Sequence, residues 1–267
     1  MARLTRFAPS PTGPLHLGHA YAALIASQRG DRFLVRIEDI DRTRCKPAYE
    51  AQIFDDLRWL GLTWQLPVMR QSQRQAAYDA ALDQLSAQGL TYCCTCTRAD
   101  IRAALSAPQE GVDGPIYPGT CRDAHHDSGA VRLNMANAAK LLPDLSFTET
   151  GTNPAQYKIN PAQLIQSSGD VILSRRDIGV AYHLAVVVDD AAQGITEVTR
   201  GQDLFAATPL QVALQHLLAL PTPAYHHHAL IRDDQGKRLA KRDDARALAK
   251  YRAEGATPAD IKRMIGL

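Results

Sequence analysis

Residues 6–20 read RFAPSPTGPLHLGHA, and this stretch limits the possible folds more than any other part of the chain. Because proline and glycine interrupt regular structure, the segment APSPTGP is predicted to be a fixed loop. The residues RLTRF before it are compatible with a strand, and helical spacing follows it at Leu17, Ala20, Leu24 and Ile25. A strand, a tight loop and a helix in this order direct backbone N–H groups and the positive end of a helix dipole at one point. The sequence therefore predicts a place where an anion could bind.

The rest of the chain alternates between strand-like and helix-like segments. Residues 33–37 are a β-rich run that leads into an acidic cluster, and helical patterns follow at about 47–60 and 73–88. Further along, DVILSRRDIGVAYHLAVVVDD contains an apolar strand and a compact helix, GITEVTRG gives another strand, and 203–219 is a strongly amphipathic helix. This alternation predicts an α/β fold with a parallel sheet whose ligands bind at the carboxyl ends of the strands.

Residues 91–170 differ in character from the segments on either side. They contain four of the five cysteines, a loop rich in proline and glycine, and short strand candidates such as AVRLNM. We expect them to form an inserted lobe between the two halves of one sheet domain, residues 1–90 and residues 171–240. Residues 241–267 then form a short C-terminal helical segment.

Length and composition exclude several classes of protein. With 267 residues, of which 45% are hydrophobic, the chain can bury one substantial core. It contains no run of about 18 apolar residues, so no membrane span is expected. The N-terminus is polar within three residues and lacks the apolar core of a secretion signal, which makes the cytoplasm the expected location.

The basic residues are unevenly distributed. A net charge of +2 does not mark the whole chain as a nucleic-acid binder. However, residues Arg232 to Arg252 contain eight lysines and arginines against four aspartates, which is a local excess of +4 (8 − 4). Such a cluster could contact phosphates, or it could be the solvated face of a charged helix.

The five cysteines lie at positions 45, 93, 94, 96 and 121. An odd and clustered set does not suit the disulfide framework of a secreted protein. The sequences YCCTCT and YPGTC suit a metal site in a reducing compartment better, because closely spaced thiolates are zinc ligands. Cys45 lies apart from this cluster and is interpreted as a structural residue.

Two separated motifs resemble the signatures of class I aminoacyl-tRNA synthetases, namely PSPTGPLHLGHA near the N-terminus and GKRLAKRDD near the C-terminus. The sequences RFAPSPTG, VRIEDIDRTR and VTRGQDL narrow this resemblance to the branch for glutamate and glutamine. The motifs extend from residue 6 to residue 242 and so cover nearly the whole chain. The resemblance implies a Rossmann-like catalytic domain and a ligase that uses ATP with Mg²⁺.

The sequence continues for about 25 residues after the second motif, so we do not expect the anticodon-binding domain of a glutamyl-tRNA synthetase. It is most similar to the truncated paralogues in this branch, which activate L-glutamate and attach it to the queuosine base at the wobble position of tRNA(Asp). The alternatives are a catalytic fragment of a glutamyl-tRNA synthetase that charges tRNA(Glu), and a non-catalytic zinc-dependent tRNA-binding module. We expect a monomer that does not bind membranes.

The resemblance assigns ATP binding to two segments, with the residues His16, Gly18 and His19 in the first and Arg238, Leu239 and Lys241 in the second. His16 and His19 are three residues apart and therefore lie on one face of a first helical turn, where imidazole N–H groups can reach phosphate oxygens. Lys241 is expected to follow the β- and γ-phosphates as pyrophosphate leaves. Where the family has serine, this chain has Ala240, so one phosphate contact is lost and slower activation is expected. The alternative is that both histidines are ordinary loop and helix residues without a ligand.

Glutamate carries two carboxylates and one ammonium group, so its pocket needs cations and an anion. The resemblance assigns this pocket to Arg6, Phe7, Ala8, Pro9, Ser10, Glu38, Tyr182 and Arg200. Arg6 and Arg200 are the candidate cations, because a guanidinium can bind a carboxylate through two parallel hydrogen bonds. Glu38 is the candidate partner of the ammonium group, and Ser10 and Tyr182 supply hydroxyls. The sequence leaves open which arginine binds which carboxylate, and a surface ion pair is the alternative for Arg6 and Glu38.

The predicted zinc ligands are Cys94, Cys96 and Cys121, with Tyr117 as the fourth ligand implied by the resemblance. Structural zinc takes four ligands, and His125 is the conventional alternative to a tyrosine. Cys93 is expected to point to the opposite face of its strand. The histidines at 226–228 resemble a metal-binding run, but their place in an apolar strand predicts a packing role or a position beside ATP.

Overall fold

The computed structural model describes residues 2–104, 110–111, 114–231 and 246–267. Its N-terminal half contains a three-stranded parallel sheet of β1 (Leu4–Phe7), β2 (Arg32–Ile37) and β3 (Gln65–Arg70), with β2 in the middle of the order β1-β2-β3. Helix α1 (Leu17–Arg29) connects β1 to β2, and α2 (Pro47–Trp59) connects β2 to β3. The predicted strand, loop and helix at the N-terminus are confirmed.

A second sheet continues the first one. It contains β12 (Glu197–Gly201), β13 (Ala224–His228), β8 (Leu145–Glu149) and β9 (Ala155–Ile159), in the order β12-β13-β8-β9. The first three strands are parallel to one another and β9 is antiparallel to β8. The backbone of Leu4 bonds to Thr196, which directly precedes β12, so the two sheets meet at β1 and β12. The resulting order β3-β2-β1-β12-β13 is that of a Rossmann-like fold, as predicted.

Short contacts hold α1 against the sheet. The Thr5 hydroxyl of β1 donates a hydrogen bond of 2.6 Å to the carbonyl of Ala26 near the end of α1. A Cβ atom at Gly30, which follows the helix, would lie only 2.3 Å from that hydroxyl oxygen. Glycine at this position therefore lets the helix turn into β2 while it stays close to β1.

The inserted lobe has a sheet of its own. Helix α3 (Gln75–Ala87), preceded by the 3₁₀ turn η1 (Gln71–Gln73), leads into β4 (Thr91–Cys94). β4 pairs with β7 (Ala130–Leu133), which pairs with β10 (Ile172–Arg175) and through it with β11 (Gly179–Val180). The remaining lobe elements are α4 (Arg98–Ala104), the two-residue strands β5 (Glu110–Gly111) and β6 (Gly114–Pro115), α5 (Met135–Leu141) and α6 (Pro161–Ser167).

Strand pairing crosses the predicted boundaries of the lobe. β8 and β9, which lie within residues 91–170, extend the main sheet through β13. β10 and β11, which lie within residues 171–240, complete the sheet of the lobe through β7. The chain thus passes from the lobe to the main sheet and back before it enters α7 (Tyr182–Ala192). The division into four segments stays a prediction.

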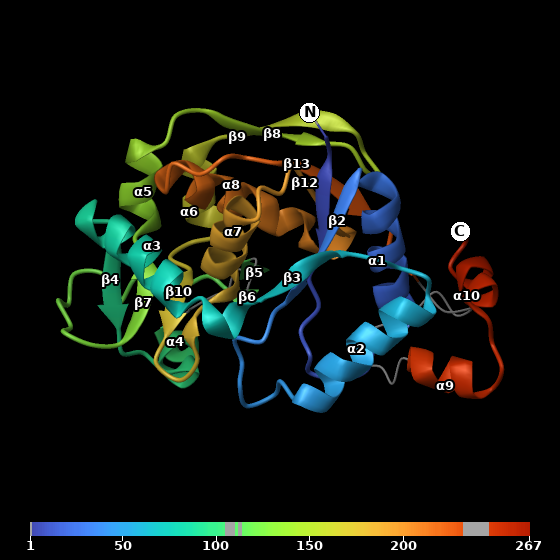
Figure 1. Cartoon of the computed structure of the whole chain (residues 1–267). Coiled ribbons are helices and arrows are strands. Elements are labelled where there is room, and N and C mark those ends of the chain that lie inside the picture. Colours follow the sequence, from blue (N-terminus) through green and yellow to red (C-terminus); the bar gives the residue numbers. More distant parts are fainter. Residues whose placement is uncertain (1, 105–109, 112–113, 232–245) are drawn as a thin grey trace.

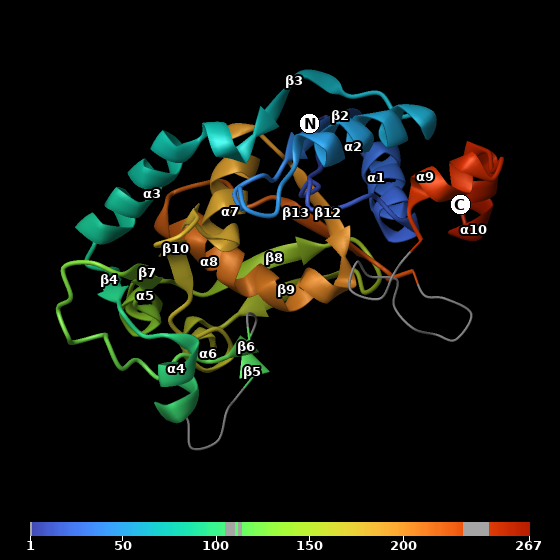
Figure 2. The ribbon, with the colours of Figure 1, turned by 90° about the horizontal axis from the view of Figure 1, so that it is seen from below.

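The C-terminal helices pack at the other end of the molecule from the lobe (Figures 1 and 2). These helices are α9 (Leu248–Ala253) and α10 (Pro258–Met264), as predicted for a C-terminal helical segment. Leu248 and Ile261 are fully buried in one apolar cluster with residues of α1, β2 and α2. The backbone N–H of Leu248 also donates to the carbonyl of Leu15 at 2.8 Å, which ties α9 to the loop in front of α1.

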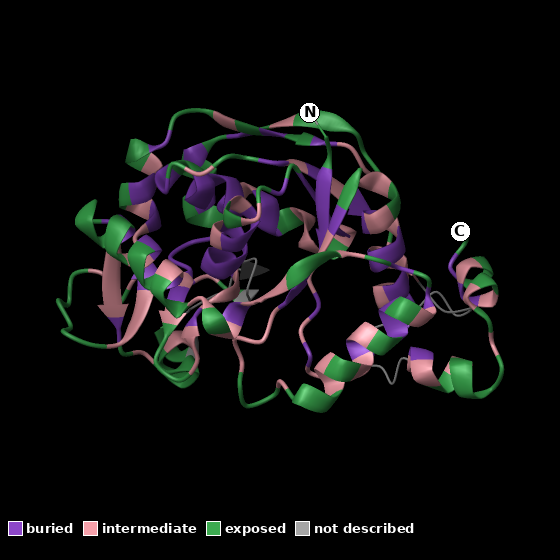
Figure 3. Ribbon diagram, in the orientation of Figure 1, coloured by how far each residue is buried: buried purple, intermediate pink, exposed green. Residues whose placement is uncertain are grey.

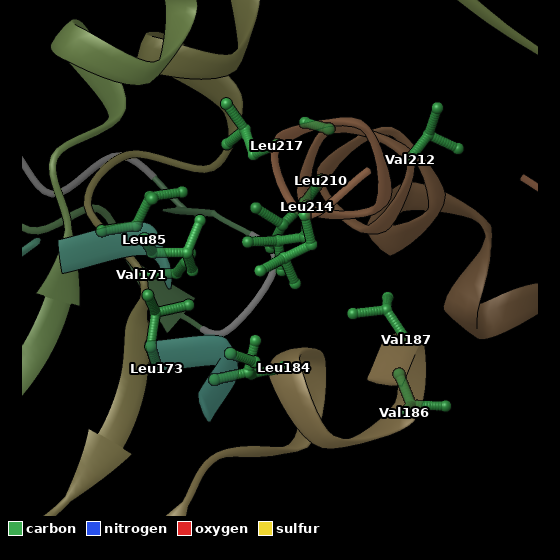
Figure 4. Packing of buried hydrophobic residues seen from close by; sticks show 14 of the residues in the cluster. Leu85, Val171, Leu173, Leu184, Val186, Val187, Leu210, Val212, Leu214 and Leu217 are labelled. Atoms are coloured by element: carbon green, nitrogen blue, oxygen red, sulfur yellow. The ribbon is translucent and has the colours of Figure 1, made fainter. Parts of the chain in front are cut away.

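The larger apolar core lies between the main sheet and the lobe. It is built around α7 and α8 (Thr208–Leu217), which follows the 3₁₀ segment η2 (Gln202–Ala207), and both helices are largely buried (Figure 3). Leu184 of α7, Leu214 of α8 and Leu85 of α3 meet side chains that approach from β10 and the residues before it (Figure 4). Because α7 and α8 are fixed on several sides, the residues at their N-termini are held in defined positions. In the described part of the chain, no helix is both long and apolar enough to cross a bilayer.

Candidate active site

A cavity of about 560 Å³ opens where β1 and β12 end. Ten of the residues predicted from the sequence line it, namely Arg6, Phe7, Ala8, Ser10, His16, Gly18, His19, Glu38, Tyr182 and Arg200. Pro9 is not among the lining residues, but its carbonyl accepts the backbone N–H of Glu38 at 3.0 Å. The cavity lies where the strand order of a Rossmann-like sheet reverses, which is the usual ligand position in such folds.

The loop in front of α1 is held by its own carbonyl groups. The carbonyls of Pro9 and Pro11 accept the backbone N–H groups of Glu38 and Lys46, each at 3.0 Å. His16 forms an antiparallel bridge with Ala247. Ile231 lines the cavity as well. Arg238, Leu239 and Lys241, and most of the basic cluster Arg232–Arg252, lie outside the described residues.

His16 and His19 cap α1 reciprocally. The Nδ1 atom of His16 accepts the backbone N–H of Gly18 at 3.1 Å, and the Nδ1 atom of His19 accepts the backbone N–H of His16 at 3.1 Å. The two rings lie close together, with their centroids 3.8 Å apart. Because each Nδ1 is an acceptor, a neutral imidazole at either position carries its proton on Nε2. The arrangement therefore provides two N–H donors beside the positive end of the helix dipole, which suits an anionic ligand.

Arg6 is buried and anchored by a carboxylate that the sequence analysis missed. Its Nε and Nη2 atoms donate to the two oxygens of Asp190 at 3.0 and 3.1 Å, and its Nη1 donates to the carbonyl of Thr199 at 3.1 Å. These bonds use three of the five N–H groups, so two remain for a ligand carboxylate. Burial excludes the alternative that Arg6 belongs to a surface ion pair. Asp190 ends the apolar run VVVDD, and a charged residue at the end of such a run was the available signal.

A second buried arginine links Asp190 to Glu38. Arg36, which is fully buried, donates to Asp190 at 2.6 Å and to Glu38 at 3.2 Å. Burial alone raises the pKa of Asp190, but the nearby Arg36 and Arg6 outweigh it and lower the pKa to about 2. Burial raises the pKa of Glu38, which Arg36 and Arg6 offset only in part. Glu38 is therefore a fixed carboxyl group that faces the cavity and suits an ammonium ligand.

Arg200 is held differently, because its partners are neutral. Its Nη1 donates to the Gln211 amide at 2.6 Å, its Nη2 to the Thr208 hydroxyl at 2.8 Å, and its Nε to the Nε2 atom of His227 at 3.0 Å. The guanidinium also lies over the ring of Tyr225, 5.2 Å from its centroid. Within the described ranges, no carboxylate is bonded directly to Arg200. Its positive charge is thus not neutralised by contact and is available to an anionic ligand.

Tyr182 and His228 complete the walls of the cavity. Tyr182 is the first residue of α7, and burial raises the pKa of its phenol, so the hydroxyl stays protonated. Of the three histidines at 226–228, His228 lines the cavity. Its Nδ1 faces the carbonyl of Ala229 at 2.9 Å, and its ring packs edge-on against Tyr21 with centroids 5.0 Å apart. Tyr21 was not predicted, and its only sequence signal is its place one helical turn after Leu17.

The cysteine cluster forms in the lobe as predicted. The sulfur atoms of Cys94, Cys96 and Cys121 lie within 4.8 Å of one another. The Tyr117 Oη is 3.4 Å from the sulfurs of both Cys94 and Cys96, and the sulfurs of Cys96 and Cys121 are 3.4 Å apart. A tetrahedral zinc ion about 2.3 Å from each sulfur would place the sulfurs about 3.8 Å from one another. The observed spacing fits such an ion.

His125 lies elsewhere. It lines a separate cavity of about 610 Å³ between α3 and the lobe, together with Cys93. Cys94 is buried in the cluster with Tyr117, so the two neighbouring cysteines face opposite sides of β4, as the alternation along a strand predicts. The geometry thus favours Tyr117 over His125, although the identity of the fourth ligand stays a prediction.

Two features of the cluster suit thiolate ligands. Burial alone raises the pKa of Cys121, but hydrogen bonds from Tyr117 and from the backbone of Thr95 lower it to about 5. The guanidinium of Arg132 lies 3.8 Å from the centroid of the Tyr117 ring, which places a positive charge beside the cluster. Cys45 is remote from these residues, and its thiol approaches the carbonyl of Glu38 at 3.9 Å.

Comparison with known proteins connects this geometry to a family. Residues 3–267 match the model of the class I tRNA synthetases (E and Q), catalytic domain. A glutamyl-Q tRNA(Asp) synthetase of Rhodobacter capsulatus is 60% identical, and the alignment covers 99% of this chain and all of that protein. A protein of the same name from Nocardia farcinica is 43% identical, with 97% of this chain and 82% of that protein covered.

The fold is similar to a longer solved protein as well. The crystal structure of a glutamate tRNA ligase from Elizabethkingia meningosepticum, in complex with its amino acid, superposes with a TM-score of 0.76 and 26% sequence identity. The match covers 99% of this chain and 60% of that ligase. This chain thus spans about three fifths of the length of the ligase.

Proposed function

The chain belongs to the class I tRNA synthetases for glutamate and glutamine, and from this we propose that it activates L-glutamate with ATP and transfers the glutamyl group to the queuosine base of tRNA(Asp). The substrate class follows the names of the two relatives, glutamyl-Q tRNA(Asp) synthetases, one of which shares 60% of its residues with this chain. The reaction is a ligation in two steps, and both use the cavity at the ends of β1 and β12.

In the first step, an oxygen of the glutamate α-carboxylate attacks the α-phosphorus of ATP, the bond to the β-phosphate breaks and pyrophosphate leaves. Such a step needs little covalent chemistry from the protein, which must orient two anions and stabilise charge on the phosphates. His16 and His19 would donate their Nε2–H groups to phosphate oxygens, where the dipole of α1 adds positive potential. Lys241 would supply a further positive charge, as the family resemblance implies. Mg²⁺ would accompany ATP and supply additional charge.

The amino acid would be held by groups of opposite charge. Glu38 offers its carboxylate to the ammonium group, and Arg6 and Arg200 offer N–H groups to the two carboxylates. Arg200 favours glutamate over glutamine, because a guanidinium with only neutral partners gains more from a carboxylate than from a neutral amide. Tyr182 and Ser10 would add neutral hydroxyl contacts. We therefore expect glutamate to be the substrate and glutamine a poor one.

In the second step, a hydroxyl of the queuosine cyclopentene-diol attacks the carbonyl carbon of the adenylate and an ester bond forms. The bond between that carbon and the phosphate oxygen breaks, and AMP leaves with the hydroxyl proton. The basic cluster Arg232–Arg252 would hold backbone phosphates, which positions an RNA without reading its sequence. Because tRNA is the acceptor, we place this activity in the cytoplasm. That the protein acts as a monomer stays an expectation.

The lobe would carry one structural zinc ion. Cys94, Cys96 and Cys121 would ligate it as thiolates, and Tyr117 would complete the tetrahedron. Zinc bound in this way supplies rigidity to a small lobe and takes no part in the chemistry at the cavity. The spacing of the three sulfurs supports this role.

The observation that best supports an enzyme over a binding module is that one cavity collects groups for both substrates, with His16 and His19 for phosphates and Arg6, Glu38 and Arg200 for an amino acid. The test is ATP–pyrophosphate exchange with each of the twenty amino acids, followed by transfer of labelled glutamate to tRNA. We expect exchange that depends on glutamate, ATP and Mg²⁺. If no amino acid supports exchange, the chain is a binding module.

A further inference from the structure

Behind Arg200 lies a buried pair of side chains that do not touch the cavity. In the register of the main sheet, Arg200 of β12 is opposite His227 of β13. Glu149 is the last residue of β8 and reaches the same histidine from the other side. Glu149 is 2% exposed and His227 is fully buried. The three strands thus align an arginine, an imidazole and a carboxylate in one row.

The hydrogen bonds fix the tautomer of His227. Arginine has no acceptor, so the bond of 3.0 Å from the Nε of Arg200 requires a lone pair on the Nε2 of His227. A neutral imidazole then carries its proton on Nδ1, which faces a carboxylate oxygen of Glu149 at 2.5 Å. The Thr208 hydroxyl also lies 3.3 Å from the same Nε2, and it is compatible with a lone pair there.

Glu149 is itself held in place by the backbone. Its other oxygen accepts the N–H groups of Gly151 at 2.6 Å and of His227 at 3.0 Å. Rotation of the carboxylate would break both bonds. A Cβ at position 151 would also lie 2.2 Å from the carbonyl of His227, so only glycine allows the chain to pass this close. The position of the carboxylate relative to His227 is therefore set by the fold.

We propose that Glu149 and His227 are positioning residues for the glutamate pocket, which orient Arg200 and stabilise its charge through a neutral imidazole instead of a direct ion pair. This inference rests on the proposed function, because it assigns to Arg200 the binding of a substrate carboxylate. A direct carboxylate partner, such as Asp190 provides for Arg6, would satisfy part of the guanidinium charge before the substrate arrives. Here the imidazole of His227 separates the carboxylate of Glu149 from the guanidinium of Arg200.

The electrostatics around His227 agree with a neutral ring. Burial first, and then the neighbouring Arg200, lower its pKa to about 4, although the hydrogen bond to Glu149 acts in the opposite direction. The ring is also enclosed by aromatic side chains, since it stacks parallel on Tyr225 and packs edge-on against Phe205. At neutral pH, His227 can therefore transmit the polarity of Glu149 without carrying a charge itself.

The decisive variant is Glu149→Gln. An amide keeps one oxygen for the N–H groups of Gly151 and His227, but it directs its NH₂ group at the Nδ1 of His227. The imidazole must then accept at Nδ1 and carry its proton on Nε2, where it meets the N–H of Arg200. Two donors cannot bond, so Arg200 loses its third anchor. The analogous change of aspartate to asparagine in a serine-protease triad also acts through the wrong tautomer.

We expect Glu149→Gln to raise the KM for glutamate about 10-fold or more, as for the loss of a hydrogen bond to a charged group, while the KM for ATP changes less than about twofold. The matched control is Glu197→Gln, which makes the same change on β12. Glu197 is equally buried but bonds to Arg29 and Thr150 and does not touch Arg200. It should lower stability and leave the KM for glutamate unchanged.

A second measurement needs no substrate. ¹⁵N NMR of the histidine side chains distinguishes the two neutral tautomers, and we expect His227 to be protonated on Nδ1 in the natural protein and on Nε2 in Glu149→Gln. A proton on Nε2 in the natural protein would overturn the inference, as would an unchanged KM for glutamate in a folded Glu149→Gln protein or an equal rise in Glu197→Gln. If the natural protein fails to activate glutamate, the proposed function is wrong. The tautomer of His227 is measured without substrate, so that result does not depend on the proposed function.

Discussion

Asp190→Asn is the substitution whose effect the structure predicts in most detail. Asp190 binds two buried guanidinium groups, those of Arg6 and Arg36, and asparagine keeps its shape while removing its charge. The pKa of about 2, against an ordinary value of 3.8, corresponds to about 2 kcal/mol of stability at neutral pH. Breaking a buried charge pair typically costs about 3–5 kcal/mol, because the remaining charge stays buried. We therefore expect Asp190→Asn to lower the free energy of unfolding by about 2–5 kcal/mol.

The loss should depend on pH in a defined direction. Because the folded state lowers the pKa of Asp190, its contribution is fully present above the unfolded value near 3.8 and disappears as the pH falls toward 2. Urea unfolding of both proteins between about pH 7 and pH 3 measures this. The difference in unfolding free energy should be constant at the upper end and should shrink below about pH 4. The KM for glutamate should also rise in Asp190→Asn, because Arg6 loses its anchor.

Asp56→Asn is the matched control, and its expected effect on the free energy of unfolding has the opposite sign. Asp56 is 3% exposed, and among the described residues its Oδ2 has no hydrogen-bond partner. Burial raises the pKa of Asp56 to about 6, so the natural protein loses stability as the pH rises through this value. Asp56→Asn should therefore stabilise the protein at neutral pH by about 1 kcal/mol or more.

If Asp190→Asn is as stable as the natural protein at pH 7, or if its loss of stability persists unchanged at acid pH, the assigned hydrogen-bond network of Asp190, Arg6 and Arg36 is wrong.

Three further predictions follow from the fold and the two sites. Lys241→Ala should slow glutamate-dependent pyrophosphate exchange by about 10²-fold, since it removes a charge that we propose acts on the transition state. A rate within a few-fold of that of the natural protein would contradict this. Chelation of zinc should expose the lobe at residues 91–125 to proteolysis before the main sheet. Elemental analysis should show that Tyr117→Phe binds zinc more weakly and that His125→Ala binds it fully. The reverse pattern would mean that His125 is the fourth ligand. Leu184→Ala, in the core between α7 and α8, should cost about 2–5 kcal/mol in urea unfolding, and a smaller loss would mean that the cavity collapses.

The fold was largely predictable, because local sequence patterns indicate most of its elements. Proline and glycine fix the loop before α1, and the alternation of strands and helices specifies a parallel sheet. The assignment of β8 and β9 to the main sheet could not be read in the same way. β8 pairs with β13, which lies about 75 residues away, through the single residue pair Tyr225 and Glu149, and β9 joins the sheet through β8. Pairing at such a distance is decided by tertiary packing and leaves no local signal.

The site residues that belong to a sequence motif could be predicted, whereas the buried residues that hold them in place could not. Arg6, Glu38 and Arg200 all line one cavity, as the motifs suggested. Asp190 and Glu149, which hold two of these residues in place through direct or relayed hydrogen bonds, are both fully enclosed and were not identified. An acidic residue in a strand or helix can be seen in the sequence. The side chain to which it bonds is known only once the fold brings the two together.

The most direct test of the central claim is the identity of the acceptor. Labelled glutamate is offered to purified tRNA(Asp) with and without queuosine, to queuosine-containing tRNA(Asp) that lacks its 3′-terminal adenosine, and to tRNA(Glu). We predict transfer to both queuosine-containing forms of tRNA(Asp), whether or not the terminal adenosine is present, and no transfer to the other two. Transfer that requires the terminal adenosine, or a preference for tRNA(Glu), would contradict the proposed function and identify the chain as the catalytic part of a glutamyl-tRNA synthetase.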